Sequence, residues 1–205
     1  MKKQLILVIV LILMIIASLI ILMNMLFSDR NVDKTVNKND LWNYVKKSDS
    51  PTFGDTNSKH QVVVFVDFNC PTCRKFYEKE YKNTIQPAIK NKKIAYAEVQ
   101  HPFINQESKQ YATISHYVYQ VARQKAYEKY KRLAYHYNTT PKDVLKRLHL
   151  DKDKHMEVLD LYNDHKDAGY NLNQDKTFKV THTPSVYVDG KLLKDYSQLN
   201  KYIKK

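Results

Sequence analysis

The chain opens with two basic residues followed by one long apolar run. Residues 5–27 carry no charge, and Ser18 and Asn24 are the clearly polar interruptions. A helix of this length crosses a hydrocarbon core of about 30 Å, so the pattern predicts an N-terminal transmembrane helix within residues 1–27. Lys2 and Lys3 precede the run, which predicts that the C-terminal body is exported. The run is longer than that of a cleaved signal peptide and no clear A-x-A site follows it, which favours a retained anchor.

Residues 28–59 are polar and predict a linker that leads to a folded domain over residues 60–205. A short apolar patch at residues 41–45 predicts one or two helical turns within the linker. The sequence does not decide whether Trp42 in this patch packs on the domain or lies at the membrane interface. Residues 51–55 contain a proline and a glycine and predict a turn into the fold.

Three segments then predict a β-α-β unit. Residues 62–68 are a continuous β-branched and aromatic run, which is typical of a strand buried on both faces. Residues 71–91 have helical periodicity, with Pro71 in the first turn and Pro87 at a bend. Residues 93–99 alternate between the two faces of a second strand.

Helical patterns continue over about residues 107–169. Residues 107–137 predict one broken helix or two. A further helix begins with Thr140 as N-cap and Pro141 at its first position and ends near residue 150. Another helix, over residues 153–168, ends at Gly169. Together these segments predict a helical insert.

The chain finally returns to strands. Residues 185–188 predict a strand, Asp189-Gly190 a two-residue hairpin turn, and residues 191–193 the returning strand. A short helix over residues 196–203 closes the chain. The order β-α-β, helical insert, β-β-α, with a C-x-x-C motif at the first strand-to-helix junction, predicts an α/β fold of the thioredoxin type.

The candidate chemistry lies in the C-x-x-C motif, which holds the two cysteines of the chain, Cys70 and Cys73. Directly after a strand, this motif places the first sulfur at a helix N-terminus, where unpaired N–H groups and the helix dipole favour a thiolate. The pKa of such a cysteine falls from about 8.5 to roughly 3.5–7.5, which makes it a nucleophile and a good leaving group. Two cysteines are too few for a structural disulfide framework. The motif therefore predicts a redox couple.

Charge adds little to this interpretation. Beyond residue 27 the chain has 32 basic and 21 acidic residues, a net charge of +11. This favours anionic neighbours such as lipid head groups, but abundant Lys, Asn and Tyr also fit an AT-rich genome without a selected partner. The basic residues are scattered, which argues against nucleic-acid binding. The histidines lack paired-ligand spacing and no second C-x-x-C exists, so neither a metal site nor a cofactor is predicted.

Residues 64–73 and 180–191 resemble the two hallmark blocks of the DsbA-like thiol:disulfide oxidoreductases, in particular the membrane-associated, BdbD-type members of Gram-positive-type bacteria. The resemblance covers residues 50–203, including an aromatic stretch at 127–137. It implies that Cys70 is the nucleophile that forms mixed disulfides and that Cys73 is the more buried resolving thiol. Pro71 and Thr72 would then tune the redox poise, and the Thr72 hydroxyl could donate to sulfur.

The resemblance also implies a cis-proline loop at Thr183-Pro184. A cis bond before the strand would expose backbone groups of Thr183, which could pair with an extended substrate chain beside Cys70. An ordinary trans turn is the alternative.

Three positions need separate interpretation. Many relatives have a buried carboxylate six residues before the first cysteine, where it assists proton transfer at the resolving thiol. Here that residue is Val64, so the proton relay must come from water or another group. Asp67 matches a common acid of the family, and it either modulates the site or serves as a structural hydrogen-bonding residue. His182 replaces a usual glycine, and it either lowers the pKa of Cys70 as a cation or faces solvent.

Three functions fit these features. The first is an oxidase, held in the cell membrane with its catalytic domain on the extracytoplasmic side, that introduces disulfides into unfolded secreted or surface proteins with thiols. A DsbB-like membrane quinone reductase is its candidate reoxidant. The second is a reductase or isomerase of the same fold, because redox direction depends on the potential. The third is a non-catalytic thioredoxin-like binding module or, least favoured, a zinc site.

Overall fold

The computed structural model describes residues 2–28, 35–136, 139–165, 178 and 180–203. The chain divides into two compact units, Met1–Lys34 and Thr35–Lys205. The first unit contains helix α1 (Lys2–Ser28), whose side chains are described at Gln4 and over residues 11–23. Within the described part of the chain, no helix is both long and apolar enough to cross a membrane. The predicted anchor is therefore not confirmed.

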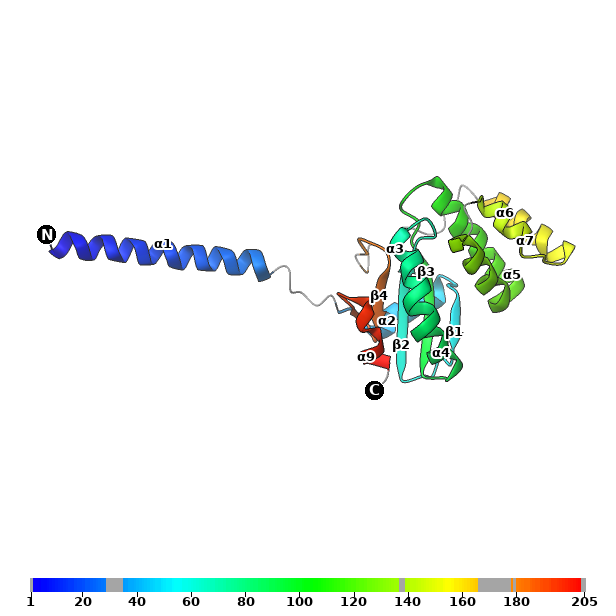
Figure 1. The fold of residues 1–205 in the computed structure, drawn as a ribbon, viewed down its shortest axis with the longest axis horizontal. Helices are drawn as coiled ribbons and strands as arrows, with labels where there is room; N and C mark the ends of the chain where they lie inside the picture. The colour runs from blue at the N-terminus through cyan, green and yellow to red at the C-terminus, as the bar shows by residue number, and fades with distance from the viewer. Residues whose placement is uncertain (1, 29–34, 137–138, 166–177, 179, 204–205) are drawn as a thin grey trace. The chain divides into compact units, whose positions relative to one another are not determined.

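The second unit is built on one mixed sheet in the order β1-β3-β2-β4-β5 (Figure 1). The strands are β1 (Thr52–Gly54), β2 (His60–Val66), β3 (Ile94–Gln100), β4 (Ser185–Val188) and β5 (Lys191–Leu192). β2 runs parallel to β3, and the β1–β3, β2–β4 and β4–β5 pairs are antiparallel. The strands predicted from the sequence are present with ends shifted by up to two residues. β1 was not predicted, because its three residues lie inside the segment interpreted as a turn.

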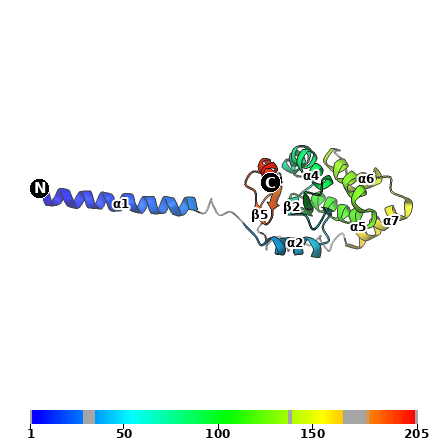
Figure 2. The ribbon, with the colours of Figure 1, turned by 90° about the horizontal axis from the view of Figure 1, so that it is seen from below.

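Both faces of the sheet are covered, as the continuous apolar run of β2 predicts. Val62, Val64 and Val66 belong to one core cluster, and Val63 and Phe65 belong to the other. The face that carries Val62, Val64 and Val66 is covered by three helical segments that follow one another without a break. They are α3 (Pro71–Phe76), the π-helical segment η2 (Tyr77–Ile85) and α4 (Gln86–Lys90). α9 (Leu199–Ile203), preceded by the 3-10 turn η4 (Tyr196–Gln198), lies on the same face (Figure 2).

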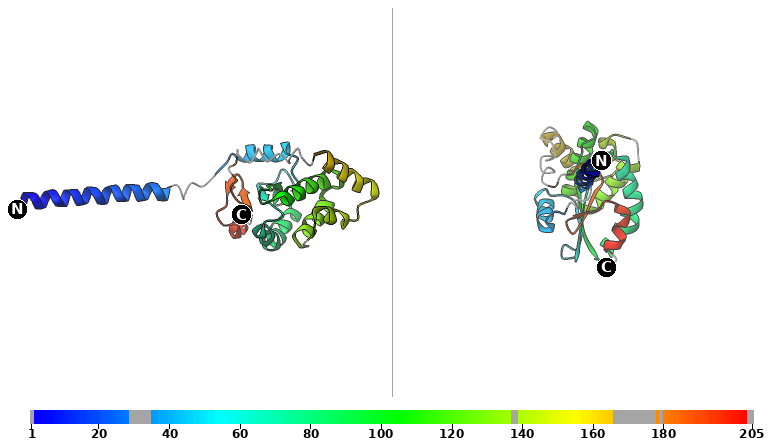
Figure 3. Two further views of the ribbon diagram at one scale, coloured as in Figure 1. Left: turned by 90° about the horizontal axis from the view of Figure 1, so that it is seen from above. Right: turned by 90° about the vertical axis from the view of Figure 1, so that its left-hand side faces the viewer.

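The opposite face is covered by α2 (Lys38–Lys47) (Figure 3). This differs from the predicted linker over residues 28–59, because the folded unit begins at Thr35. Leu41, Trp42 and Val45 are buried, and they join the cluster that contains Val63 and Phe65. The physical reason is that this apolar sheet face needs a cover, which the short apolar patch supplies. Trp42 therefore packs on the domain.

The helical insert consists of α5 (Gln106–His136), α6 (Pro141–Lys146) and α7 (Lys152–His165). α5 is broken at Arg123, where φ is 65° and ψ is −169°, so it forms two helices in sequence. Thr140 caps α6 as predicted, because its hydroxyl oxygen accepts from the Asp143 N–H at 3.2 Å. α6 ends at Lys146, earlier than predicted. The predicted stop at Gly169 lies outside the described residues.

Candidate active site

Cys70 lies at the junction of β2 and α3, where the chain changes from extended to helical geometry. Its φ and ψ of −79° and 117° make it the N-cap of α3, with Pro71 in the first turn. The Cys70 N–H donates to the Asp67 carbonyl oxygen at 3.1 Å, and the Cys70 carbonyl oxygen accepts from the Arg74 N–H at 3.1 Å. Because α3 continues into η2 and α4, the sulfur lies at the positive end of a long helical segment, which favours a thiolate.

The Cys70 sulfur has three polar neighbours. Its Sγ lies 2.9 Å from the Thr72 hydroxyl oxygen and 3.3 Å from the Thr183 carbonyl oxygen, to which Cys70 donates only when it is protonated. A hydrogen bond from the Cys73 side chain is the largest influence, and together with that of the Thr72 hydroxyl it lowers the pKa of Cys70 from 9.0 to about 4, although burial opposes the change. Cys70 would therefore be a thiolate at neutral pH.

Cys73 lies one helical turn further on and has the opposite character. Its side chain is fully buried, whereas Cys70 is 6% exposed. Burial is the main cause that raises the pKa of the Cys73 thiol, and the neighbouring Cys70 sulfur raises it further. The two sulfurs thus form an unequal pair, in which one is held as an anion and the other keeps its proton and donates to it.

Thr183 and Pro184 form the other side of the site, directly before β4. Both are buried, and the peptide bond between them is cis. The Thr72 hydroxyl donates to the Thr183 carbonyl oxygen at 2.9 Å, which joins the loop to the C-x-x-C helix. The structure therefore brings five of the predicted residues together: Cys70, Pro71, Thr72 and Cys73 on one segment and Thr183 on the facing loop.

His182 lies at the edge of this loop. Its side chain is exposed, and its Nδ1 lies 3.3 Å from the Thr181 hydroxyl oxygen. No interaction with Cys70 is found for it among the described residues. Of the two interpretations of His182, the geometry favours a solvent-facing side chain.

Asp67 organises the loops around Cys70 as a buried hydrogen-bond acceptor. One carboxylate oxygen accepts from the Asn69 N–H at 2.9 Å, and the other accepts from the N–H groups of Phe103 and Ile104 at 3.1 and 3.2 Å. Asp67 therefore ties the turn before Cys70 to the loop between β3 and α5. This geometry favours the structural interpretation of Asp67.

The loop after β3 places two exposed apolar residues near the redox site, and the sequence did not mark either as a candidate site residue. Phe103 and Ile104 are 54% and 41% exposed, although both are large and apolar. Asn69, which directly precedes Cys70, donates to the Asn105 side-chain oxygen at 2.9 Å and so places the loop beside the redox site. No pattern in the sequence marked these residues, because their position depends on the hydrogen bonds of Asp67.

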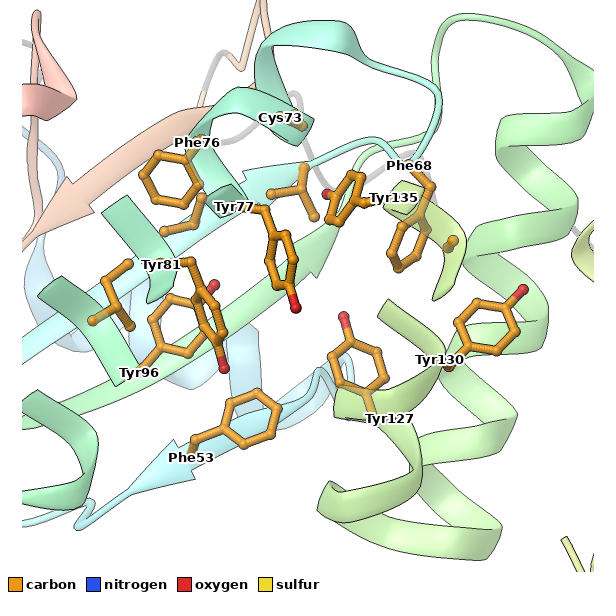
Figure 4. Packing of buried hydrophobic residues seen from close by; sticks show 14 of the residues in the cluster. Phe53, Phe68, Cys73, Phe76, Tyr77, Tyr81, Tyr96, Tyr127, Tyr130 and Tyr135 are labelled. Carbon is orange, nitrogen blue, oxygen red and sulfur yellow. The ribbon is translucent and has the colours of Figure 1, made fainter. Parts of the chain in front are cut away.

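A buried ion pair lies in the core cluster that also contains Cys73. Glu98 on β3 accepts from Lys131 on α5 at 3.0 Å, and the two side chains are 3% and 1% exposed. Tyr96 and Tyr127 also donate to Glu98, at 2.8 and 2.5 Å. Figure 4 shows Tyr96 and Tyr127 within an aromatic cluster that extends to Cys73. The Lys131 Nζ lies 3.5 Å from the centre of the Tyr81 ring, a cation–π contact.

An acidified thiol beside a protonated one, at a helix N-terminus and facing a cis-proline loop, is the arrangement that thiol–disulfide exchange requires. Fold and site together define a thiol–disulfide oxidoreductase of the thioredoxin superfamily. The comparisons agree, since the thioredoxin family model matches residues 46–205. The chain therefore belongs to the thioredoxin family.

The similar solved structures carry the same fold. BdbD from Bacillus subtilis is 17% identical with a TM-score of 0.64, and the match covers 76% of this chain and 91% of that one. The thiol-disulfide exchange protein alpha-DsbA2 from Wolbachia pipientis is 21% identical with a TM-score of 0.64, covering 82% and 94%. DsbA from Chlamydia trachomatis is 18% identical with a TM-score of 0.62, covering 76% and 88%. Comparison with curated proteins finds no match.

Proposed function

We propose that this protein is an exported, membrane-anchored oxidase that introduces disulfides into secreted or surface proteins through the Cys70-Cys73 couple. The observation that carries the proposal is the contrast between the two thiols, with the pKa of Cys70 lowered to about 4 and that of Cys73 raised. Stabilising the Cys70 thiolate stabilises the reduced form, and a stabilised reduced form makes a C-x-x-C protein a stronger oxidant.

The proposed reaction begins with the Cys70–Cys73 disulfide. A substrate thiolate attacks the Cys70 sulfur, which forms a mixed disulfide and releases Cys73 as a thiolate that takes up a proton. A second substrate thiolate then attacks the substrate sulfur of the mixed disulfide and releases the Cys70 thiolate. The substrate gains a disulfide and loses two electrons, which the Cys70-Cys73 couple holds as a dithiol. The low pKa of Cys70 makes it the better leaving group in the second step.

Thr183 would align the substrate for this reaction. Its carbonyl oxygen is 3.3 Å from the Cys70 sulfur, so an extended chain that pairs with the backbone of this loop passes over the reactive atom.

The proposed location rests on the apolar run of residues 5–27, the two lysines before it and the helical course of α1. A DsbB-like membrane quinone reductase is the proposed reoxidant.

The redox equilibrium with glutathione tests the direction of the reaction. We expect a potential nearer to about −120 mV, the value of a strong oxidant, than to about −270 mV, that of a reductant. A value near the lower figure would instead support a reductase or isomerase of the same fold.

Two experiments in cells test the remaining parts. In a Cys73→Ala variant, the Cys70 thiolate can still attack a partner's disulfide and form a mixed disulfide, but no Cys73 thiol is present to attack that bond and release the partner. The variant should therefore accumulate mixed disulfides, and its trapped partners should be exported proteins. A Cys70→Ser variant should trap none. Reporter fusions to the C-terminus should be active outside the cytoplasm, and activity inside it would contradict the proposed location.

A further inference from the structure

A pocket of about 790 Å³ opens beside Cys70. Cys70 and Pro71 are among its lining residues, whereas Thr183 and Pro184 are not. The pocket is therefore separate from the cis-proline loop, and Cys70 contacts both. Its volume lies within the range of about 300–1,000 Å³ that is typical of ligand sites, so it can hold more than one side chain.

The floor of the pocket is apolar and aromatic. It is formed by Phe68, Tyr111, Ala134 and Tyr135, all of which are at least nine-tenths buried. Phe68 lies just before the C-x-x-C motif, and the others come from α5. Such a floor suits a large apolar side chain, because packing an aromatic or aliphatic group against it removes apolar surface from water.

One wall of the pocket is positively charged. Arg74, Lys75 and Lys79 lie along the helical segment that begins at Cys70, and all three are exposed. Among the described residues, Arg74 and Lys75 take part in no salt bridge, and Lys79 adds a further positive charge to the wall.

Two acidic residues, Glu78 and Glu107, also line the pocket. Glu78 pairs with Lys82 at 2.7 Å and lies 3.1 Å from His136 Nε2, and Glu107 accepts from Asn69 at 3.3 Å. Three cationic lining residues face two carboxylates, one of which is paired with Lys82, so the net charge of these lining residues is positive.

We propose that this pocket is a substrate-selecting site that binds a large apolar side chain and a nearby carboxylate of an unfolded protein, on one flank of its reacting cysteine. This inference rests on the proposed function, because it needs a polypeptide thiol at Cys70. The cis-proline loop holds the chain on one side of Cys70, and the pocket holds the flanking residues on the other. The apolar floor and the cationic wall select which cysteines react first.

The test uses four peptides, each with two cysteines, and the oxidised full-length protein. The peptides differ only at the positions that flank the first cysteine: Phe with Asp, Phe with Lys, Ser with Asp, and Ser with Lys. We expect kcat/KM for disulfide formation to be highest for the Phe–Asp peptide and about fivefold lower for Phe–Lys, since a few partly exposed charge pairs contribute on this scale.

A charge-reversal variant, Arg74→Glu/Lys75→Glu, should invert the Asp-over-Lys preference and leave the Phe-over-Ser preference. The matched control is Lys46→Glu/Lys47→Glu, which has the same change in net charge on α2, across the sheet from α3. It should keep the wild-type order of the four peptides. If charge reversal disturbs folding, Arg74→Gln/Lys75→Gln should abolish the charge preference without inverting it.

A small dithiol separates the two proposals. Its oxidation at Cys70 uses no pocket, so wild type and control should oxidise it equally, and a change in the charge-reversal variant would report altered reactivity of Cys70 itself. If the protein oxidises the small dithiol and all four peptides at equal rates, the pocket proposal is overturned and the proposed function stands. If it oxidises none of them, the proposed function fails first.

Discussion

The Thr72 hydroxyl should set part of the oxidising power of the couple. It has one proton to donate and two acceptors within reach, the Cys70 sulfur and the Thr183 carbonyl oxygen, each at 2.9 Å. When Cys70 is a thiol, it can itself donate to Thr183, and the Thr72 proton is free to serve either acceptor. When Cys70 is a thiolate, the sulfur carries the negative charge and is the stronger acceptor. Thr72 thus stabilises the thiolate more than the thiol.

The magnitude follows from this difference. A hydrogen bond to a charged group contributes about 1.5–3 kcal/mol, and the Thr72 hydroxyl gives up a neutral bond to Thr183 to make it. The net preference is then about 1.4 kcal/mol, or one pKa unit. A Thr72→Val variant should raise the pKa of Cys70 from about 4 to about 5, and at pH 7 it should lower the reduction potential by about 30 mV.

Two assays measure these shifts. The rate of alkylation of Cys70 and the ultraviolet absorbance of its thiolate give the pKa as a function of pH, and equilibration with glutathione gives the potential. Thr72→Ser keeps the hydroxyl and is the matched control, so it should retain both wild-type values. If Thr72→Val left the pKa of Cys70 unchanged, the hydrogen bond would not favour the thiolate and the reasoning would be refuted.

Three further predictions concern stability, measured by urea denaturation. The reduced protein should lose stability relative to the oxidised one as the pH falls from 9 towards 4, because the folded pKa of Cys70 is depressed from 9.0 to about 4 and its stabilisation is lost through that range; equal pH profiles for the two forms would contradict this. Lys131→Met should cost about 3–5 kcal/mol, since it leaves the Glu98 carboxylate buried without its cation, and adding Glu98→Gln should recover part of that loss; additive losses would argue against the pairing. Asp67→Ala should cost about 1–3 kcal/mol, because three N–H groups lose their acceptor; a loss no larger than that of an exposed Asp55→Ala control would show that these bonds are not stabilising.

Local patterns predicted those elements whose sequences are periodic in themselves. The β2 run, the start of α6 at Thr140 and the hairpin at Asp189-Gly190 each carry their own signal. Both turn residues of the hairpin have positive φ, 50° and 83°, as the two-residue turn requires. The C-x-x-C motif likewise fixed the position of the reactive sulfurs, because a strand followed by Pro71 places Cys70 at a helix N-terminus.

The parts that the sequence left out depend on distant partners. α2 is a short apolar patch in a polar segment, and its burial depends on the sheet face that contains Val63 and Phe65. The pocket combines Phe68 with side chains of α5 such as Tyr135, more than 60 residues later in the chain. No local sequence pattern predicts this pocket, because it forms only where the helical insert packs on the helix that begins at Cys70.

Val64 lies beside the buried Glu98–Lys131 ion pair in the sheet. Val64 and Glu98 are partners in the parallel β2–β3 register, so their side chains lie next to each other on one face of the sheet. A carboxylate at position 64, as in many relatives, would place two like charges side by side, which disfavours ionisation of both. Glu98 is already held by Lys131, Tyr96 and Tyr127. Because Glu98 already places a buried carboxylate beside it on β3, position 64 accommodates an uncharged residue more readily than a second carboxylate.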